Sequence, residues 1–66
     1  MNYSERLKEL RIEKGLTQKE MASKLDVSTT GYAGWEQGKR EPSISFIIKI
    51  CEFFGVTTDY FLGVEE

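Results

Sequence analysis

The side chains that this sequence lacks limit the chemistry it can perform. The chain of 66 residues contains no histidine and a single cysteine, Cys51. Metal sites usually draw on several His, Cys or carboxylate ligands, and nucleophilic catalysis usually pairs a hydroxyl or thiol with a nearby base. No such constellation can be assembled, so we predict that the protein is not an enzyme and has no metal or cofactor. One cysteine also excludes an internal disulfide, which favours a reducing, cytoplasmic location.

Non-covalent binding is the chemistry that remains, and the charges set its limits. The formal net charge is −2. All nine Lys and Arg residues lie within residues 1–49, where seven acidic residues leave a net charge of +2. Residues 50–66 contain four acidic residues and no basic ones, a net charge of −4. Phosphate binding is therefore possible at the first end of the chain, although unspecific electrostatic affinity should be weak.

Helices must position any binding residues, and the clearest helix start lies at Thr17. Thr17 and Glu20 have the spacing of a capping box, in which each side chain accepts a hydrogen bond from the backbone amide of the other residue. Apolar residues then recur at helical spacing, which predicts a short helix over residues 18–25. Asp26 interrupts the pattern at a turn that needs a positive φ, a conformation that Asp tolerates better than most residues.

Another helix is predicted over residues 29–37, with Ser28 as its N-cap. Counted from the start of the chain, residues 18–25 form the second predicted helix and residues 29–37 the third. Tyr32 and Trp35 lie three residues apart, so they can share one buried face of this helix. Two short helices joined by so brief a turn must cross steeply, and the small Ala22 would allow the close approach. The stretch therefore predicts a helix-turn-helix.

Three further helices are expected around this pair. The first is capped by Ser4 or a neighbour and ends at Gly15, and the last is capped by Thr57 or Thr58. The fourth follows the cap Ser43 and is apolar nearly all round, which is typical of a helix that is central to the core or partly buried in a partner. The apolar residues of these regions are Leu7, Leu10, Leu16, Ile44, Ile47, Ile48, Ile50, Cys51, Phe53, Phe54, Tyr60, Phe61 and Leu62.

The predicted fold class is all-α, with residues 1–66 forming one domain. Cys51 is surrounded in the sequence by apolar residues, so we expect an inert thiol in the core or in an interface. Four apolar residues near the end of the chain exceed what one small core is expected to cover, which favours a protein interface there. They are Phe54, Tyr60, Phe61 and Val64.

Short motifs in a fixed order extend over essentially the whole chain. They are Arg6-Leu7, Leu10-Arg11, Lys14-Gly15-Leu16-Thr17-Gln18, Met21-Ala22, Leu25, Val27-Ser28, Trp35-Glu36, Gly38-Lys39-Arg40-Glu41-Pro42-Ser43, Gly55-Val56 and Asp59-Tyr60-Phe61-Leu62-Gly63. Their order resembles the xenobiotic-response-element group of helix-turn-helix regulators, relatives of the phage Cro and repressor proteins. The resemblance implies a five-helix, lambda-repressor-like domain that binds specific double-stranded DNA. It also implies a transcriptional repressor that acts as a dimer on a palindromic operator.

The same resemblance implies which residues contact DNA. In that family the third helix lies in the major groove and reads bases from its first turn and from one turn later. The start of the second helix, the loop after the third helix and the start of the fourth helix meet the DNA backbone. A homodimer would form through helices four and five and the C-terminal tail. The implied residues are Ser28, Thr29, Thr30, Gly34 and Gln37 for the third helix, and Gln18, Lys39, Arg40 and Ser43 for the DNA backbone.

Two glycines depart from the family pattern. Gly31 and Gly34 fall within the third helix, where each costs about 1 kcal/mol relative to Ala. Gly34 also removes a side chain from a base-reading position, and Thr29 and Thr30 offer only a hydroxyl or a contact with a thymine methyl. We therefore expect specificity to depend on close approach and on DNA shape, with Gly34 permitting a tighter fit of the helix in the groove.

The family often joins the positions of Arg11 and Glu36 by a partly buried ion pair, which we expect here as a structural feature. The alternative to DNA binding is a protein-interaction module that keeps the fold. The acidic total, the two glycines and the short side chains of the third helix favour this alternative, whereas Gln18, Lys39 and Arg40 favour DNA. The salt dependence of DNA binding would separate the two.

Overall fold

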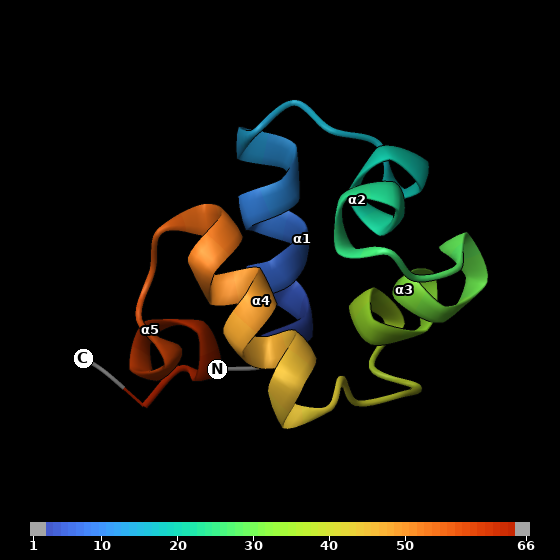
Figure 1. The fold of residues 1–66 in the computed structure, drawn as a ribbon. Helices are drawn as coiled ribbons and strands as arrows, with labels where there is room; N and C mark the ends of the chain where they lie inside the picture. Colours follow the sequence, from blue (N-terminus) through green and yellow to red (C-terminus); the bar gives the residue numbers. More distant parts are fainter. Residues whose placement is uncertain (1–2, 65–66) are drawn as a thin grey trace.

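The computed structural model describes residues 3–64 and has the predicted all-helical architecture (Figure 1). α1 packs against α3 and α5, α2 packs against α3 and α4, and α4 also packs against α5. No helix within residues 3–64 is long and apolar enough to cross a lipid bilayer. The helices are α1 (Tyr3–Glu13), α2 (Gln18–Leu25), α3 (Thr29–Gln37), α4 (Ile44–Phe54) and α5 (Thr58–Leu62).

Local capping explains where most of these helices begin. At α2 the predicted capping box is present: the Glu20 amide donates to Thr17 Oγ1 at 3.0 Å, and the Thr17 amide donates to Glu20 Oε1 at 2.8 Å. Ser28, Ser43 and Thr57 each accept a hydrogen bond from an amide three residues later, at the starts of α3, α4 and α5. These bonds satisfy amides that have no partner within the helix.

The turn between α2 and α3 has the backbone conformation that the sequence predicted. Asp26 adopts φ +59° and ψ +48°, and it is the only non-glycine residue with positive φ among residues 3–64. The next amide, of Val27, donates to the Ala22 carbonyl at 3.0 Å and closes the end of α2. Ala22 is 1% exposed, which is consistent with a close approach of the two helices.

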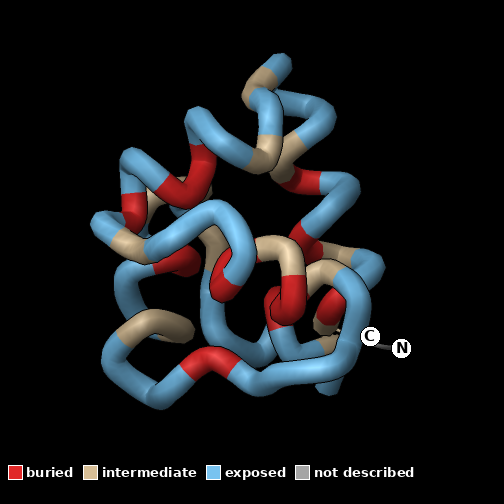
Figure 2. Tube along the Cα trace, turned by 90° about the vertical axis from the view of Figure 1, so that its right-hand side faces the viewer, coloured by how far each residue is buried: buried red, intermediate tan, exposed pale blue. Residues whose placement is uncertain are grey.

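Ten buried apolar residues form a core to which every helix contributes. Figure 2 shows buried positions interspersed with exposed and intermediate ones along the chain. Leu16 and several residues of α4 are partly buried around this core. The core residues are Leu7, Leu10, Met21, Ala22, Leu25, Tyr32, Trp35, Ile50, Cys51 and Phe61.

The structure differs from the sequence prediction at both ends of the chain. Ser4 lies inside α1 and is buried, so it is not the N-cap, and residues 1–2 lie outside the described range. The sequence suggested that Tyr60, Phe61 and Leu62 close over the core, and it also counted Tyr60 and Phe61 among the residues that favour an interface. Phe61 is completely buried in α5, which packs against α1 and α4, so it belongs to the core. Tyr60 and Leu62 are each 39% exposed. A five-residue helix can direct only one of three consecutive side chains inward.

Cys51 is a buried residue of α4, in agreement with the expected inert thiol. Its Sγ lies 3.8 Å from the Thr57 carbonyl, to which the thiol donates a weak hydrogen bond. Burial raises its pKa, which keeps the thiol protonated and poorly nucleophilic at neutral pH.

Candidate nucleic-acid interface

The start of α3 forms an exposed surface of the helix-turn-helix. Ser28 accepts a hydrogen bond from an amide one turn into α3, and Ser28, Thr29 and Thr30 are all exposed. Another side of α3 is fixed in the core by Tyr32 and Trp35, which are 0% and 4% exposed with ring centroids 5.9 Å apart. These two aromatic residues therefore determine which residues of α3 face outward.

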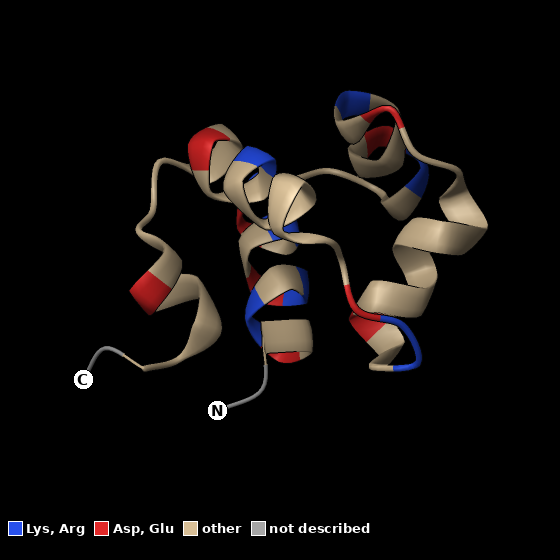
Figure 3. Cartoon of the chain, turned by 60° about the horizontal axis from the view of Figure 1, so that its bottom comes forward, with Lys and Arg blue, Asp and Glu red and all other residues tan. Residues whose placement is uncertain are grey.

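α3 itself provides no positive charge. Its one charged residue is Glu36, and Figure 3 shows that the nearest basic residues in the sequence belong to the loop that follows the helix. In this loop Lys39 and Arg40 are exposed, as is Gln37 at the end of α3. An electrostatic contact with an anionic partner at this end of the helix must therefore come from the loop.

Hydrogen bonds fix the loop to α3 and to α1. The amides of Lys39 and Arg40 both donate to the Gly34 carbonyl, at 3.0 and 3.2 Å. The Tyr3 hydroxyl donates to the Arg40 carbonyl at 3.1 Å. Ser43, also exposed, then begins α4. The backbone of the two basic residues implied for DNA contact is thus held at the end of α3 by hydrogen bonds to α3 and α1.

Gly31 and Gly34 lie beneath a side chain of the loop that follows α3. Both glycines are buried, and the side chain of Arg40 lies over them. A Cβ added to Gly34 would come within 3.0 Å of Arg40 Cδ and 3.2 Å of Arg40 Cγ. The space beside Gly34 is therefore filled by an arginine of the following loop in this structure.

A hydrogen-bonded network joins α1, α2 and α3 beneath this surface. Arg11 Nε lies 2.7 Å from Glu36 Oε2 and Arg11 Nη2 lies 3.2 Å from Glu36 Oε1. The side chains are 12% and 2% exposed, respectively. Gln18 Nε2 donates to Glu36 Oε1 at 3.1 Å, and the Tyr32 hydroxyl donates to Glu36 Oε2. The nearly buried Glu36 carboxylate thus has three donors, as a buried charge requires.

The network shifts the pKa values of its members. Burial alone would raise the pKa of Glu36, but hydrogen bonds from Arg11, Tyr32 and Gln18 outweigh it and hold this pKa below its ordinary value. Burial and the hydrogen bond to the Glu36 carboxylate raise the pKa of the Tyr32 hydroxyl far above its ordinary value. At neutral pH the network therefore contains an ionised Glu36, a neutral Tyr32 and a cationic Arg11.

The hydrogen bonds of Tyr32 and Gln18 were not predicted from the sequence. Tyr32 was assigned to the core alone, although a Tyr four residues before a Glu on one helix lies within reach of it. Gln18 was assigned to the DNA backbone, but its side-chain amide has a partner inside the protein. The Gln18 side chain therefore joins α2 to α3 through Glu36, whether or not Gln18 also contacts DNA.

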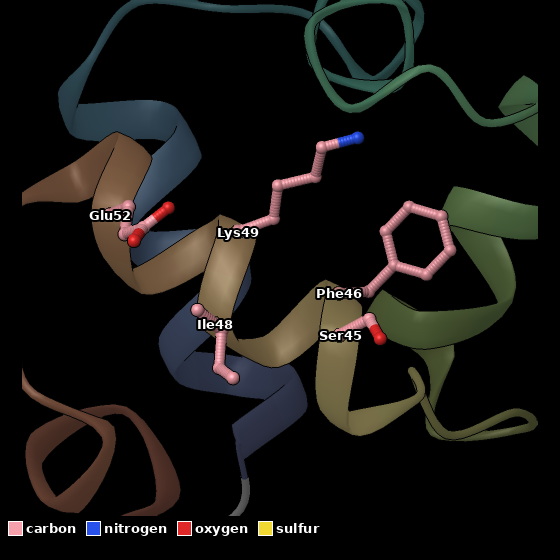
Figure 4. A pocket seen from close by; sticks show the side chains of 5 residues that line it. All are labelled: Ser45, Phe46, Ile48, Lys49 and Glu52. Atoms are coloured by element: carbon pink, nitrogen blue, oxygen red, sulfur yellow. The ribbon is translucent and has the colours of Figure 1, made fainter.

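A shallow pocket on α4 has no catalytic arrangement. Figure 4 shows its lining, in which Lys49 extends from α4 toward α2 and Phe46 points toward α3. Lys49 Nζ lies 3.4 Å from the Leu25 carbonyl at the end of α2, and the Phe46 ring centroid lies 5.1 Å from that of Trp35. These contacts attach α4 to the helix-turn-helix. Within residues 3–64 no three His, Cys, Asp or Glu side chains are grouped to hold a metal ion.

The comparison with known proteins agrees with this geometry. A family described as "Helix-turn-helix" matches residues 7–61. The chain is 38% identical over its full length to the HTH-type transcriptional regulator ImmR of Bacillus subtilis, of which it covers 52%. It is 42% identical over its full length to the HTH-type transcriptional activator BcrR of Enterococcus faecalis, of which it covers 32%.

A phage relative matches over most of the chain. The cryptic phage CTXphi transcriptional repressor RstR of Vibrio cholerae is 32% identical over 54 residues, which are 82% of this chain and 49% of the relative. The chain thus spans about half or less of the length of these relatives. Since the family match extends over all five helices of the described structure, the chain belongs to the helix-turn-helix family.

Proposed function

We propose that this domain binds specific sequences of double-stranded DNA as part of a transcriptional regulator, with α3 in the major groove. The observation that carries the proposal is the exposed first turn of α3. It presents the hydroxyl groups of Ser28, Thr29 and Thr30, while Tyr32 and Trp35 hold another side of the helix in the core. A rigidly seated helix with an exposed N-terminal turn is the geometry by which helix-turn-helix proteins reach base edges.

Contacts with the DNA backbone are proposed around this helix. Lys39 is exposed beside the end of α3 and supplies a point charge for a phosphate. The starts of α2 and α4, at Gln18 and Ser43, direct backbone amides outward, which favours binding of an anion. Such contacts orient the protein on the duplex, whereas base selection falls to α3.

We propose repression as the mode of regulation. Among the relatives, one is named an activator and one a repressor. Repression by occupancy requires only that the protein cover a promoter, whereas activation requires a further surface that contacts the transcription machinery. An operator placed within a reporter promoter tests this: repression should appear when the protein is expressed, and increased transcription would contradict it.

A homodimer on a palindromic operator is proposed for the complex. Apolar side chains on α4, on α5 and at Val64 after α5 are exposed, and burial against a second copy would remove them from water. Sedimentation equilibrium at low micromolar concentration should detect dimers, with or without operator DNA, and a strictly monomeric protein on a single half-site would contradict the proposal. The exposed residues are Ile44, Ile48, Tyr60, Leu62 and Val64.

The experiment that tests the proposed function is a selection from random duplex DNA, followed by titration of the enriched sequence at low and moderate salt. Enrichment of a two-fold symmetric site, with affinity that falls steeply as salt rises, would support a DNA-binding regulator. Absence of any enriched sequence, together with no binding at low salt, would overturn it. The protein-interaction module would then be the better description of the domain.

Alanine variants should separate base reading from phosphate contact. Thr29→Ala and Thr30→Ala should relax the preference for the selected site, each by roughly 1 kcal/mol of discrimination, because they remove groups directed at base edges. Lys39→Ala should weaken all sequences alike and reduce the salt slope by about 1. Thr58→Ala is a matched control, since Thr58 occupies the same position in α5 as Thr29 in α3. An effect of Thr58→Ala equal to that of Thr29→Ala would contradict the assignment.

A further inference from the structure

The side chain of Arg40 occupies the space that a larger residue at position 34 would fill. Its Cδ and Cγ atoms lie 3.0 and 3.2 Å from the position of a Cβ built on Gly34. Its Nη1 lies 3.7 Å from the position of a Cβ built on Gly31, which is three residues nearer the start of α3. The side chain therefore runs along α3 from Gly34 toward the first turn of the helix.

The guanidinium group ends beside the exposed hydroxyl groups of the first turn. A Cβ on Gly31 would also lie 3.0 Å from Ser28 Oγ, so this hydroxyl and Arg40 Nη1 border the same small space. Ser28 is the N-cap of α3, and Thr29 and Thr30 follow it. A charged group from the loop that follows α3 thus reaches back toward the start of α3, the end that the proposed function directs at the bases.

The backbone of Arg40 is fixed by hydrogen bonds, so the location of the guanidinium group does not depend on the side-chain conformation alone. Its amide donates to the Gly34 carbonyl at 3.2 Å, and its carbonyl accepts from the Tyr3 hydroxyl at 3.1 Å. A pre-positioned backbone reduces the conformational entropy that the side chain must lose on binding. Arg40 is thus anchored to both α3 and α1.

The electrostatic surroundings of this guanidinium also favour an external partner. A cation near the start of a helix opposes the helix dipole, which is positive at that end. Among residues 3–64 no Asp or Glu forms an ion pair with Arg40. The guanidinium therefore keeps its donors available for electronegative atoms of a bound molecule.

We propose that Arg40 reads a guanine in the major groove and replaces the base-reading side chain that Gly34 lacks. The proposal rests on the proposed function, because it assigns one contact within the same DNA interface. An arginine can donate two parallel hydrogen bonds to guanine O6 and N7, and this is the commonest specific contact in the major groove. α3 has no Arg, Asn or Gln in its first turn that could make such a bidentate contact.

A phosphate contact is the competing role for Arg40, and the direction of the side chain favours the base. A side chain that extended away from α3 would meet the DNA backbone beside the groove. The side chain of Arg40 instead follows the surface of α3 to the turn that enters the groove. Gly34 then has a physical role, since a Cβ at this position would press against Arg40 Cδ and Cγ, whereas a Cβ at Gly31 would lie at ordinary contact distance from Arg40 Nη1.

Arg40→Lys distinguishes these roles because it keeps the charge and removes the bidentate geometry. Site selection and titration are carried out with the wild type, Arg40→Lys, and Lys39→Ala as a matched control from the same loop. Arg40→Lys should bind random duplex as the wild type does but lose roughly 10- to 100-fold in affinity for the selected site, with preference relaxed at a guanine. Lys39→Ala should weaken both DNAs by the same factor.

Two results would overturn the inference while leaving the proposed function intact. One is a wild-type site whose base preferences are unchanged in Arg40→Lys, and the other is an equal loss of affinity for all sequences in that variant. A wild-type protein that enriches no site would instead overturn the proposed function, so the two failures are distinguishable.

Gly34→Ala tests whether the glycine acts through Arg40. The added methyl group should displace Arg40 Cδ and relax the same guanine preference, while circular dichroism shows that the helical fold is retained. In an Arg40→Ala background, Gly34→Ala should then have no further effect on base preference. Fully additive effects of the two substitutions would show that Gly34 acts by direct approach to DNA, and would overturn this part of the inference.

Discussion

Replacing Arg11 with alanine should lower the free energy of unfolding by about 3 kcal/mol, because it leaves the Glu36 carboxylate nearly buried without its cationic partner. The loss should exceed that of a surface ion pair, since the carboxylate side chain is only 2% exposed. Tyr32 and Gln18 would still donate hydrogen bonds to Glu36, so the folded state should persist. Urea denaturation monitored by Trp35 fluorescence would measure the change.

The pH dependence gives this prediction a second observable. The pKa of Glu36 is lowered in the folded protein, so its contribution to stability is present above the ordinary pKa of Glu. That contribution is lost as the pH falls through the lowered, folded-state pKa. The difference in stability between the wild type and Arg11→Ala should therefore be greatest near neutral pH and should narrow below about pH 4.

The appropriate control is Lys8→Ala, which removes a positive charge from an exposed position of the same helix. Its effect should stay within about 0.5 kcal/mol. A double-mutant cycle with Arg11→Ala and Glu36→Ala should give a coupling energy well above that of independent sites. Additive effects of the two substitutions would contradict the role of the pair.

The helix boundaries could be predicted from the sequence because local signals determine them. The capping box at Thr17, the caps Ser28 and Ser43, and the left-handed residue Asp26 each act through hydrogen bonds within a few residues. Such contacts depend little on the rest of the fold. The predicted helices over residues 18–25 and 29–37 therefore match α2 and α3.

The position of Arg40 could not be predicted in the same way. Sequence spacing placed it in a loop, but its course over Gly31 and Gly34 depends on how that loop folds back onto α3. The absence of side chains at two positions creates space, and nothing in the local pattern states which residue will fill it. The sequence pattern therefore related Gly34 only to the fit of the helix in the groove, and did not predict that the Arg40 side chain lies over both glycines.

The exposed face of α4 illustrates a second limit. Its apolar pattern indicated a helix that is central to the core or partly buried in a partner, and in the structure some of its apolar side chains are buried and others are exposed. Ile50 is completely buried, whereas Ile44 and Ile48 are 77% and 48% exposed. Hydropathy alone does not distinguish a buried Ile from an exposed Ile, because the side chain is the same in both places.

Phe61→Ala should remove most of the stability of the domain, because Phe61 is completely buried and belongs to the short helix that closes the core. Truncating a buried Phe typically costs roughly 3–5 kcal/mol. A domain of this size is expected to have roughly 3–10 kcal/mol in total, so the loss should be a large fraction of the total and should clearly lower the midpoint of urea denaturation. Circular dichroism and urea denaturation would measure the loss.

Leu62→Ala is the matched control, since Leu62 is the next residue of the same helix and is 39% exposed. Its effect should stay below about 1 kcal/mol. The sequence alone allowed both a core and an interface location for Phe61, and the two locations differ in how stability depends on protein concentration. A core residue destabilises each chain equally at all concentrations, whereas an interface residue acts only where dimers form. The loss in Phe61→Ala should therefore be the same at two concentrations tenfold apart. A loss of stability seen only at the higher concentration would indicate that Phe61 lies in an interface. It would then contradict the packing of α5 against α1 and α4.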